Sequence, residues 1–255
     1  MNSFLGKYGP WALVTGASSG IGQEIAIQLD KMGLRIVITG RNEEALHSLS
    51  QQLTRSKVVV ADLSTPVGLE SLLSALEDID LGLVVANAGF GTSGDFLNSD
   101  IEMEAEMLRL NCEAPLKLAH SIGPRLASRG SGCFIFLSSI VAWQGVAGQS
   151  HYSATKAYVQ NLTEGLAIEW KPLGIHVMSA APGPVDTKFA KRAGLHLGMA
   201  DDASAVARDI LRNLGRKTTV VPGRFGKLLS YGLATAPRAF RARIMAGVAK
   251  GMLKK

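Results

Sequence analysis

The sequence predicts an α/β protein, a single doubly wound domain in which helices cover both faces of a mostly parallel, seven-stranded sheet. The first observation behind this prediction is that short apolar segments alternate with segments of helical periodicity along most of the chain. The second is that most of the apolar segments are continuous, as strands are when both faces of their sheet are buried. A chain of 255 residues with 47% hydrophobic content can also bury a sizeable core.

The predicted elements follow one another as alternating strands and helices. Strands are expected at 11–15, 34–39, 57–61, 82–86, 132–138, 175–181 and 217–221. Helices are expected near 20–32, 42–54, 66–77, 101–128, 151–171 and 201–214. Ligands of such sheets bind at the carboxyl ends of the strands, so the residues that follow each strand are the candidate site residues.

The first predicted strand leads into the glycine-rich loop GASSGIG at residues 16–22, which opens a helix. Gly16 permits a tight turn, Gly20 allows the backbone to approach a pyrophosphate, and Gly22 allows the helix to pack closely on the sheet. The N-terminus of the helix presents free N–H groups to an anion. The loop therefore predicts a dinucleotide site, although its spacing differs from G-x-G-x-x-G and a plain glycine-rich turn is the alternative. The other candidate contacts within it are Ser18, Ser19 and Ile21.

Tyr152 and Lys156 lie four residues apart on a predicted helix, and Ser139 precedes the tyrosine by thirteen residues. Positions i and i+4 share one helix face, so the phenol and the ammonium can point into one pocket. A lysine cation favours the phenolate and lowers the pKa of tyrosine from about 10 toward the range useful for proton transfer. Taken alone the pattern is weak, because tyrosine and lysine often share a solvated helix face by chance.

Together these segments resemble the short-chain dehydrogenase/reductase family in its single-domain form, from about Pro10 to Val221. Seven signals in order carry the resemblance: the loop 15–22, Asp62-Leu63, Asn87-Ala88-Gly89, Asn111, Ser139, Tyr152 with Lys156, and Pro182-Gly183. The resemblance implies a Rossmann-type fold and hydride transfer between a nicotinamide dinucleotide and a carbon–oxygen group. The segment YGPWA at 8–12 is also similar to the entry of the 3-oxoacyl-CoA and 17β-hydroxysteroid reductases of this family.

The resemblance implies four catalytic residues. Ser139 would hydrogen-bond the substrate oxygen, with Ser138 as the competing candidate. Tyr152 would exchange the proton, while Lys156 would lower the pKa of the tyrosine and bind the nicotinamide ribose hydroxyls. Asn111 would kink its helix and hold a relay water, and the alternative for it is a satisfied polar residue in a helix interior.

Three further segments are implied to contact the cofactor. Asp62 resembles the adenine contact of the family, with Leu63 beside the ring, and a turn-forming aspartate is the alternative. Small residues after the fourth strand would let the cofactor approach the backbone, or form a simple turn: Asn87, Ala88 and Gly89. The segment expected to line the nicotinamide amide contains Pro182, Gly183, Val185 and Thr187.

The end of the second predicted strand indicates the cofactor. An NAD enzyme usually places a carboxylate here to bind the ribose 2′-hydroxyl, whereas this chain has Gly40 followed by Arg41. The guanidinium of Arg41 can hold a 2′-phosphate with two hydrogen bonds. We therefore expect NADP(H) in preference to NAD(H), and the alternative is that Arg41 caps a loop and contacts only solvent.

Other features exclude several classes of protein. The two cysteines, Cys112 and Cys133, are too few for a disulfide framework and indicate a reducing compartment. The N-terminus has no long apolar segment typical of a secretory signal or a spanning helix, so a cytoplasmic location is expected. No metal-ligand spacing and no nucleic-acid recognition motif is found, so neither a metal nor a nucleic-acid partner is predicted. His151 is assigned no role, because adjacent helical residues do not share a face.

The C-terminal segment 223–255 is predicted to be a basic, partly amphipathic helical extension of a catalytic domain at 1–222. After Asp209 the chain has eleven Lys or Arg and no acidic residue, so its net charge of +6 divides into +11 after this point and −5 before it. Such segregation indicates an anionic partner.

A helix over 237–255 would align Phe240, Ile244, Val248 and Met252 in one apolar stripe. This basic amphipathic helix either contacts a membrane surface peripherally, or packs over the active site or against another subunit. The family resemblance implies a homo-oligomer, a dimer or a tetramer.

The sequence therefore predicts an NADP(H)-dependent oxidoreductase that reduces a carbonyl, or oxidises the matching alcohol, of a lipid-like or acyl-bearing small molecule. The alternative is a non-catalytic dinucleotide-binding protein, a sensor or a scaffold. The residues after Gly183, through Gly198, are expected to form a lid, in which Lys188, Lys191 and Arg192 meet an anionic group of the substrate or face water.

Overall fold

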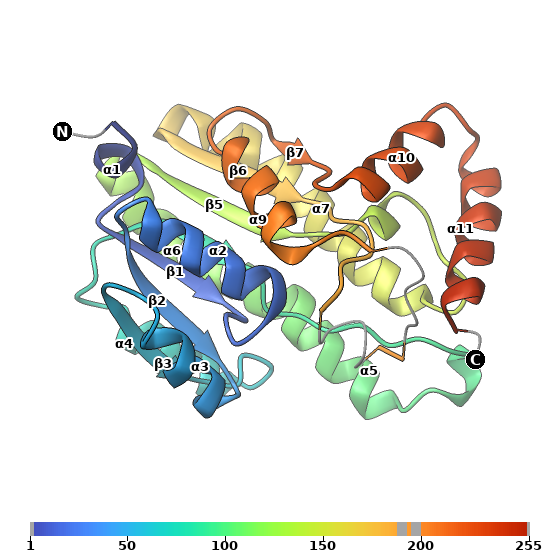
Figure 1. The fold of residues 1–255 in the computed structure, drawn as a ribbon, viewed down its shortest axis with the longest axis horizontal. Coiled ribbons are helices and arrows are strands. Elements are labelled where there is room, and N and C mark those ends of the chain that lie inside the picture. The colour runs from blue at the N-terminus through green and yellow to red at the C-terminus, as the bar shows by residue number, and fades with distance from the viewer. Residues whose placement is uncertain (1–2, 188–192, 195–199, 254–255) are drawn as a thin grey trace.

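Seven strands form one sheet in the computed structural model, which describes residues 3–187, 193–194 and 200–253. The strands are β1 Trp11–Thr15, β2 Arg35–Gly40, β3 Ser56–Val60, β4 Leu81–Ala86, β5 Gly132–Leu137, β6 Ile175–Ala180 and β7 Thr219–Val220. Their order is β3-β2-β1-β4-β5-β6-β7, and every neighbouring pair is parallel (Figure 1). From β1 the chain adds strands first toward one edge of the sheet, through β2 and β3, and then toward the other edge, starting with β4. Sheets of this kind bind their ligands at the point between β1 and β4 where this order switches. The predicted doubly wound, seven-stranded sheet is confirmed.

Helices cover both faces of this sheet. They are α1 Ser3–Tyr8, α2 Gly20–Lys31, α3 Glu43–Ser50, α4 Pro66–Ala75, α5 Ile101–Leu108, α6 Ala114–Arg129, α7 Ser150–Glu169, α9 Ala203–Arg212, α10 Arg224–Gly232 and α11 Arg238–Leu253. One buried core joins the sheet to α2, α3 and α9, and the other joins it to α4, α6 and α7. The alternation along β1 shows why both cores exist, because Ala12 and Val14 enter the first core while Leu13 enters the second.

The prediction of one continuous helix over 101–128 is wrong. A π-helical turn at Arg109–Glu113 separates α5 from α6. Pro115 has no N–H to donate to the carbonyl of Asn111 four residues earlier, so regular α-helical hydrogen bonding cannot continue through this turn. The irregularity that the resemblance implied at Asn111 is thus present, and it follows from the proline.

The C-terminal helices α10 and α11 lie at the right of Figure 1, at the opposite end of the molecule from α3 and α4. Met245 and Ala249 of α11 are buried and belong to the core that contains α4, α6 and α7. Within the described residues, none of the helices combines the length and the apolar character that crossing a membrane requires.

Candidate active site

The glycine-rich loop forms a narrow cradle after β1. Gly16 and Gly20 have positive φ angles of 64° and 61°, which glycine adopts without strain. A Cβ atom on Gly16 would lie 2.8 Å from Cα of Ala88, and one on Gly20 would lie 2.9 Å from Cγ2 of Thr187. A side chain at either position would therefore collide with the neighbouring loop, so this close approach requires glycine.

Hydrogen bonds fasten this loop to the end of β4. The amide nitrogen of Asn87 donates to the carbonyl of Thr15 at 2.8 Å and to that of Gly16 at 3.2 Å. The hydroxyl of Thr15 accepts from the backbone N–H groups of Asn87, at 3.0 Å, and Ala88, at 2.9 Å. The structural role of Thr15 was not predicted. Its hydroxyl joins the loop after β1 to the loop after β4, and the crevice between these two loops is the candidate dinucleotide site.

At the outer end of the crevice, Arg41 lies between two carboxylates. Its Nη1 atom is 2.9 Å from Oε1 of Glu106 on α5 and 3.5 Å from Oδ2 of Asp62. Ser18 is close by, because its Oγ would lie 3.5 Å from a Cβ atom on Gly40. The alternative that Arg41 contacts only solvent is therefore wrong for this structure. Burial raises the pKa of Asp62, but the hydrogen bonds from Ser64 and the nearby Arg41 cation outweigh it, so the net pKa is lowered.

At the inner end, α7 carries Tyr152 and Lys156 on its buried face. The Lys156 ammonium donates to the carbonyl of Leu137 at 2.7 Å and lies 5.9 Å from the centroid of the Tyr152 ring. The hydroxyl of Ser138 is committed to the backbone, since it donates to the carbonyl of Lys156 at 3.1 Å. The backbone contacts of the Ser139 hydroxyl are longer, at 3.4 Å to both the carbonyl of Pro182 and the N–H of Val141, and this hydroxyl also interacts with the Tyr152 side chain. This arrangement favours Ser139 over Ser138 as the substrate contact.

Burial dominates the titration of both groups. It raises the pKa of Tyr152 above its usual value, and the hydrogen bond with Ser139 opposes this increase. Burial also lowers the pKa of Lys156 from 10.5 to about 8, so the lysine is still mainly a cation at neutral pH. The low tyrosine pKa expected from the sequence is therefore not found, because the desolvation of the phenolate outweighs the opposing effect of Ser139.

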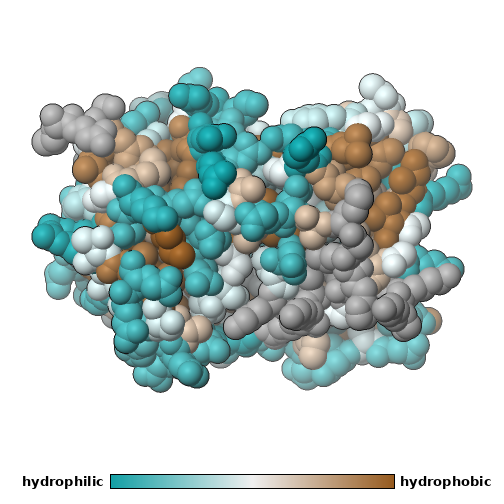
Figure 2. All heavy atoms as spheres, in the orientation of Figure 1, coloured by the Kyte–Doolittle hydropathy of each residue, from teal (hydrophilic) through white to brown (hydrophobic). Residues whose placement is uncertain are grey.

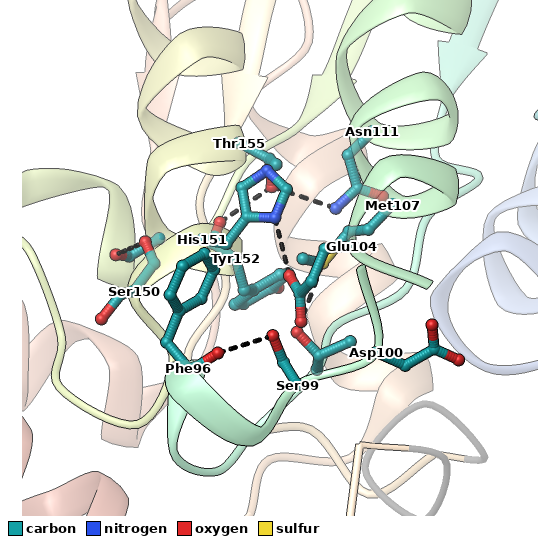
Figure 3. Close-up of polar contacts among 12 residues, drawn as sticks. Phe96, Ser99, Asp100, Glu104, Met107, Asn111, Ser150, His151, Tyr152 and Thr155 are labelled. Carbon is teal, nitrogen blue, oxygen red and sulfur yellow. Dashed lines mark hydrogen bonds and ion pairs between the residues drawn. The ribbon is translucent and has the colours of Figure 1, made fainter. Parts of the chain in front are cut away.

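Asn111 lies in the π-helical turn and faces Thr155 of α7 (Figure 3). Its amide donates to the carbonyl of Phe90 at 2.8 Å and to the hydroxyl of Thr155 at 3.1 Å, and its oxygen accepts from the N–H of Phe90 at 3.1 Å. These bonds join the loop after β4 to α7. A Cβ atom on Gly89 would lie 2.8 Å from Oδ1 of Asn111, so the glycine is needed for this approach.

The same view shows a side-chain hydrogen bond that the sequence did not predict. His151 Nδ1 lies 2.6 Å from Oε2 of the buried Glu104 (Figure 3). The pair links the start of α7 to α5. His151 is absent from the lining of the cavity described next, in keeping with the expectation that it faces away from the residues around Tyr152.

A cavity of about 210 Å³ runs through the centre of the site. The predicted residues that line it are Gly16, Ser19, Gly20, Ile21, Asn87, Ala88, Gly89, Ser139, Tyr152, Lys156, Pro182, Gly183, Val185 and Thr187. The predicted residues outside its lining are Ser18, Gly22, Arg41, Asp62, Leu63 and Asn111. Leu63 is buried in the core, and Gly22 packs against Gly16 and Asn87.

The far wall of the cavity is apolar and comes largely from the C-terminal helices. It contains Ile140, Val141, Val146, Leu229, Met245, Val248, Ala249 and Met252. Of the predicted apolar stripe, Val248 and Met252 thus face the cavity, whereas Phe240 is exposed. This arrangement favours the interpretation in which α11 packs over the active site. The lid residues Lys188, Lys191 and Arg192 lie outside the described residues.

Comparisons with known proteins agree with this geometry. Residues 10–197 match the family model described as short chain dehydrogenase. The chain is 29% identical to the 7beta-hydroxysteroid dehydrogenase of Clostridium sardiniense over 234 residues, which cover 88% of this chain and 90% of that protein.

Two solved structures are also similar. A short-chain dehydrogenase from Sphingobium yanoikuyae in complex with NADPH is 28% identical with a TM-score of 0.80, over 96% of this chain and 95% of that one. The bulky-bulky ketone specific alcohol dehydrogenase from Comamonas testosteroni is 29% identical with a TM-score of 0.76, over 90% and 95% of the two chains. The protein is a member of the short chain dehydrogenase family, an oxidoreductase that acts on hydroxyl or carbonyl groups and takes a nicotinamide dinucleotide.

Proposed function

We propose that this oxidoreductase uses NADPH to reduce the carbonyl of a bulky, apolar, lipid-like compound, or oxidises the matching alcohol with NADP⁺. The observation that carries the proposal is the position of Tyr152, Lys156 and Ser139 in one cavity whose far wall is apolar. A non-catalytic sensor or scaffold would need the glycine cradle but not this proton-transfer set. The alternative is therefore less well supported.

In the proposed reduction, the protein's side chains supply one proton to the substrate oxygen. When bound, the nicotinamide supplies the hydride to the carbonyl carbon. Ser139 donates a hydrogen bond to the carbonyl oxygen, and Tyr152 gives its phenolic proton to that oxygen as negative charge develops there. Lys156 stabilises the phenolate that remains, because its cation lies on the same helix face. Water then returns a proton to Tyr152.

The preference for NADP(H) is assigned to the outer end of the crevice. Gly40 offers no carboxylate to a ribose 2′-hydroxyl, while Arg41 and Ser18 lie beside it. A 2′-phosphate there would accept charge-assisted hydrogen bonds from Arg41. The NADPH complex of the Sphingobium yanoikuyae protein supports this assignment by similarity.

The substrate is assigned to the side of the cavity formed by the C-terminal helices. An apolar compound gains about 25 cal/mol for each Å² of apolar surface that it buries against the side chains of α10 and α11. Residues 223–255 thus act as a substrate-covering extension of the catalytic domain 1–222. The similarity to a hydroxysteroid dehydrogenase and to an alcohol dehydrogenase named for bulky ketones supports a large, apolar substrate.

We propose further that the protein works in the cytoplasm as a homodimer or homotetramer, as the family resemblance implies. Size-exclusion chromatography with light scattering measures the assembly directly. A monomer at the enzyme concentration used for activity would contradict this part of the proposal.

The proposed function is tested by incubating the purified protein and NADPH with ketosteroids, bulky aryl ketones, acyl-CoA thioesters, retinal, short aldehydes and sugars, and following cofactor fluorescence. We expect turnover of apolar ketones, and much slower turnover when NADH replaces NADPH. Activity confined to sugars would refute the substrate class, and no turnover of any compound would favour a dinucleotide-binding sensor.

A further inference from the structure

The outer surface of the C-terminal helix pair carries an exposed apolar group. Leu228 and Tyr231 of α10 are 68% and 65% exposed, and Phe240 of α11 is 53% exposed. The segment 234–240 between them is also largely exposed. In Figure 2 hydrophobic atoms gather over α10 and α11 at the right of the molecule, with hydrophilic atoms at its outer edge. Within one helix pair, the inward side chains line the cavity and the outward ones meet solvent.

Basic side chains lie on the same two helices as this apolar group. Four exposed residues, Arg224, Arg238, Arg243 and Lys250, form no salt bridge with another described residue. No acidic residue occurs between 210 and 255, so the helices themselves contain nothing to neutralise these charges. The two helices therefore expose positive charge together with aromatic and aliphatic side chains, a combination typical of helices that lie in the interface of an anionic bilayer.

The helix pair is fastened to the body of the enzyme, so this surface is preformed. Lys227 Nζ lies 2.6 Å from Oδ2 of Asp209 on α9, and the N–H of Arg224 donates to Asp201 at 2.9 Å. At the start of α10, a Cβ atom on Gly226 would lie 2.9 Å from the backbone nitrogen of Gly183, so the two backbones are in direct contact.

We infer that this outer face of α10 and α11 docks on the surface of an anionic phospholipid bilayer. Leu228, Tyr231 and Phe240 enter the boundary between headgroups and acyl chains, and the basic side chains contact phosphates. A second copy of the chain is a poorer occupant, because a two-fold interface places the same patch against itself and would oppose uncompensated arginines. Docking here also places the apolar cavity of the proposed function near the bilayer in which an apolar substrate dissolves.

The inference is tested by sedimentation of the purified full chain with vesicles of phosphatidylcholine, alone or mixed with phosphatidylglycerol. We expect the protein to pellet with the mixed vesicles and not with phosphatidylcholine alone, and to be released by high salt because salt screens the charges. The double variant Leu228→Glu/Phe240→Glu should lose binding. The double variant Arg238→Ser/Arg243→Ser should partition more weakly by about fivefold for each arginine removed.

Matched controls lie elsewhere on the molecule. Val67→Glu changes a residue that is 75% exposed on α4, and Lys31→Ser/Arg55→Ser removes the same net charge from another exposed surface. Both controls should bind vesicles like the unmodified protein. All variants should keep their far-ultraviolet circular dichroism, because every changed side chain is exposed.

Three results would overturn the inference. The first is that the unmodified protein stays in the supernatant with anionic vesicles. The second is that the α10–α11 variants bind vesicles as well as the controls do. The third is that the protein binds no vesicles, but its oligomer dissociates in the variant Leu228→Glu/Phe240→Glu. The last result would identify the surface as a subunit interface. Sedimentation needs no turnover and Tyr152→Phe should pellet normally, so failure of this inference is distinguishable from failure of the proposed catalysis.

Discussion

Lys156 holds its ammonium 5.9 Å from the centroid of the Tyr152 ring, one helical turn along the same buried face of α7. The lysine donates a hydrogen bond to the carbonyl of Leu137 at 2.7 Å, at the end of β5. Sheet and helix together therefore fix the cation beside the phenol. Proton transfer at Tyr152 depends on this arrangement, because burial by itself makes the phenolate harder to form.

Burying the Lys156 cation should make stability depend on pH in a specific direction. Its pKa is about 8 in the folded protein and 10.5 when exposed, so between these values the unfolded chain binds more protons and stability rises with pH. From pH 7 to pH 9.5 the unfolding free energy of the wild type should rise by about 2 kcal/mol relative to Lys156→Met. Urea unfolding of both proteins at the two pH values measures this difference. A constant difference would show that the lysine does not titrate in this window.

Replacing Arg41 should weaken the binding of NADPH without changing the binding of NADH. In Arg41→Ala, NADPH loses a charge-assisted contact worth about 1.5–3 kcal/mol, so its Kd should rise by about tenfold or more, while the Kd for NADH stays unchanged. Fluorescence titration with each dinucleotide measures both constants. Because Glu106 competes for the same guanidinium at 2.9 Å, Glu106→Gln should tighten NADPH and serves as the opposite control. Equal losses for both cofactors would contradict the assignment of Arg41 to the 2′-phosphate.

The Asn87 amide should stabilise both the fold and the dinucleotide site. In Asn87→Ala the carbonyls of Thr15 and Gly16 lose their donor, which should cost about 1–3 kcal/mol of unfolding free energy and weaken NADPH binding. Denaturant melts and fluorescence titration report the two effects. Asn98→Ala removes an exposed amide whose hydrogen bond is with Asp95 of the same turn, so it should change both quantities little.

Narrowing the cavity at its apolar wall should lower kcat/KM for large substrates more than for small ones. Val248→Trp places a larger side chain in the cavity, so kcat/KM for a bulky ketone should fall about tenfold or more while that for a short aldehyde changes little. Steady-state assays with NADPH provide both values. Lys250→Ala, on the exposed side of the same helix, should leave both near those of the wild type. Parallel losses for the two substrates would mean that Val248 does not contact the substrate.

The cofactor side of the site could be predicted because its determinants are local. A glycine with a positive φ, a strand followed by a loop, and two residues one helical turn apart are all encoded within a few positions. Pro115 was also visible in the sequence, but the helical periodicity on both sides concealed the break that it causes after Asn111. The prediction failed there because one missing N–H outweighed the pattern.

The remaining features depend on tertiary contacts that the sequence does not reveal. The pairing of Arg41 with Glu106 joins residues 65 positions apart, and that of His151 with Glu104 joins residues 47 positions apart. The placement of α10 depends on two glycine backbones in contact, Gly183 and Gly226. Periodicity predicted an apolar stripe on α11, but only packing could determine that Val248 faces the cavity while Phe240 faces outward.

The central claim, that Tyr152 exchanges the proton, is tested most directly by comparing wild type and Tyr152→Phe in NADPH binding and in turnover of an apolar ketone. We expect the variant to bind NADPH with an unchanged Kd and its kcat to fall by a factor of about 10²–10⁴. A variant that turns over at the rate of the wild type would contradict the claim, because the proton would then have another source.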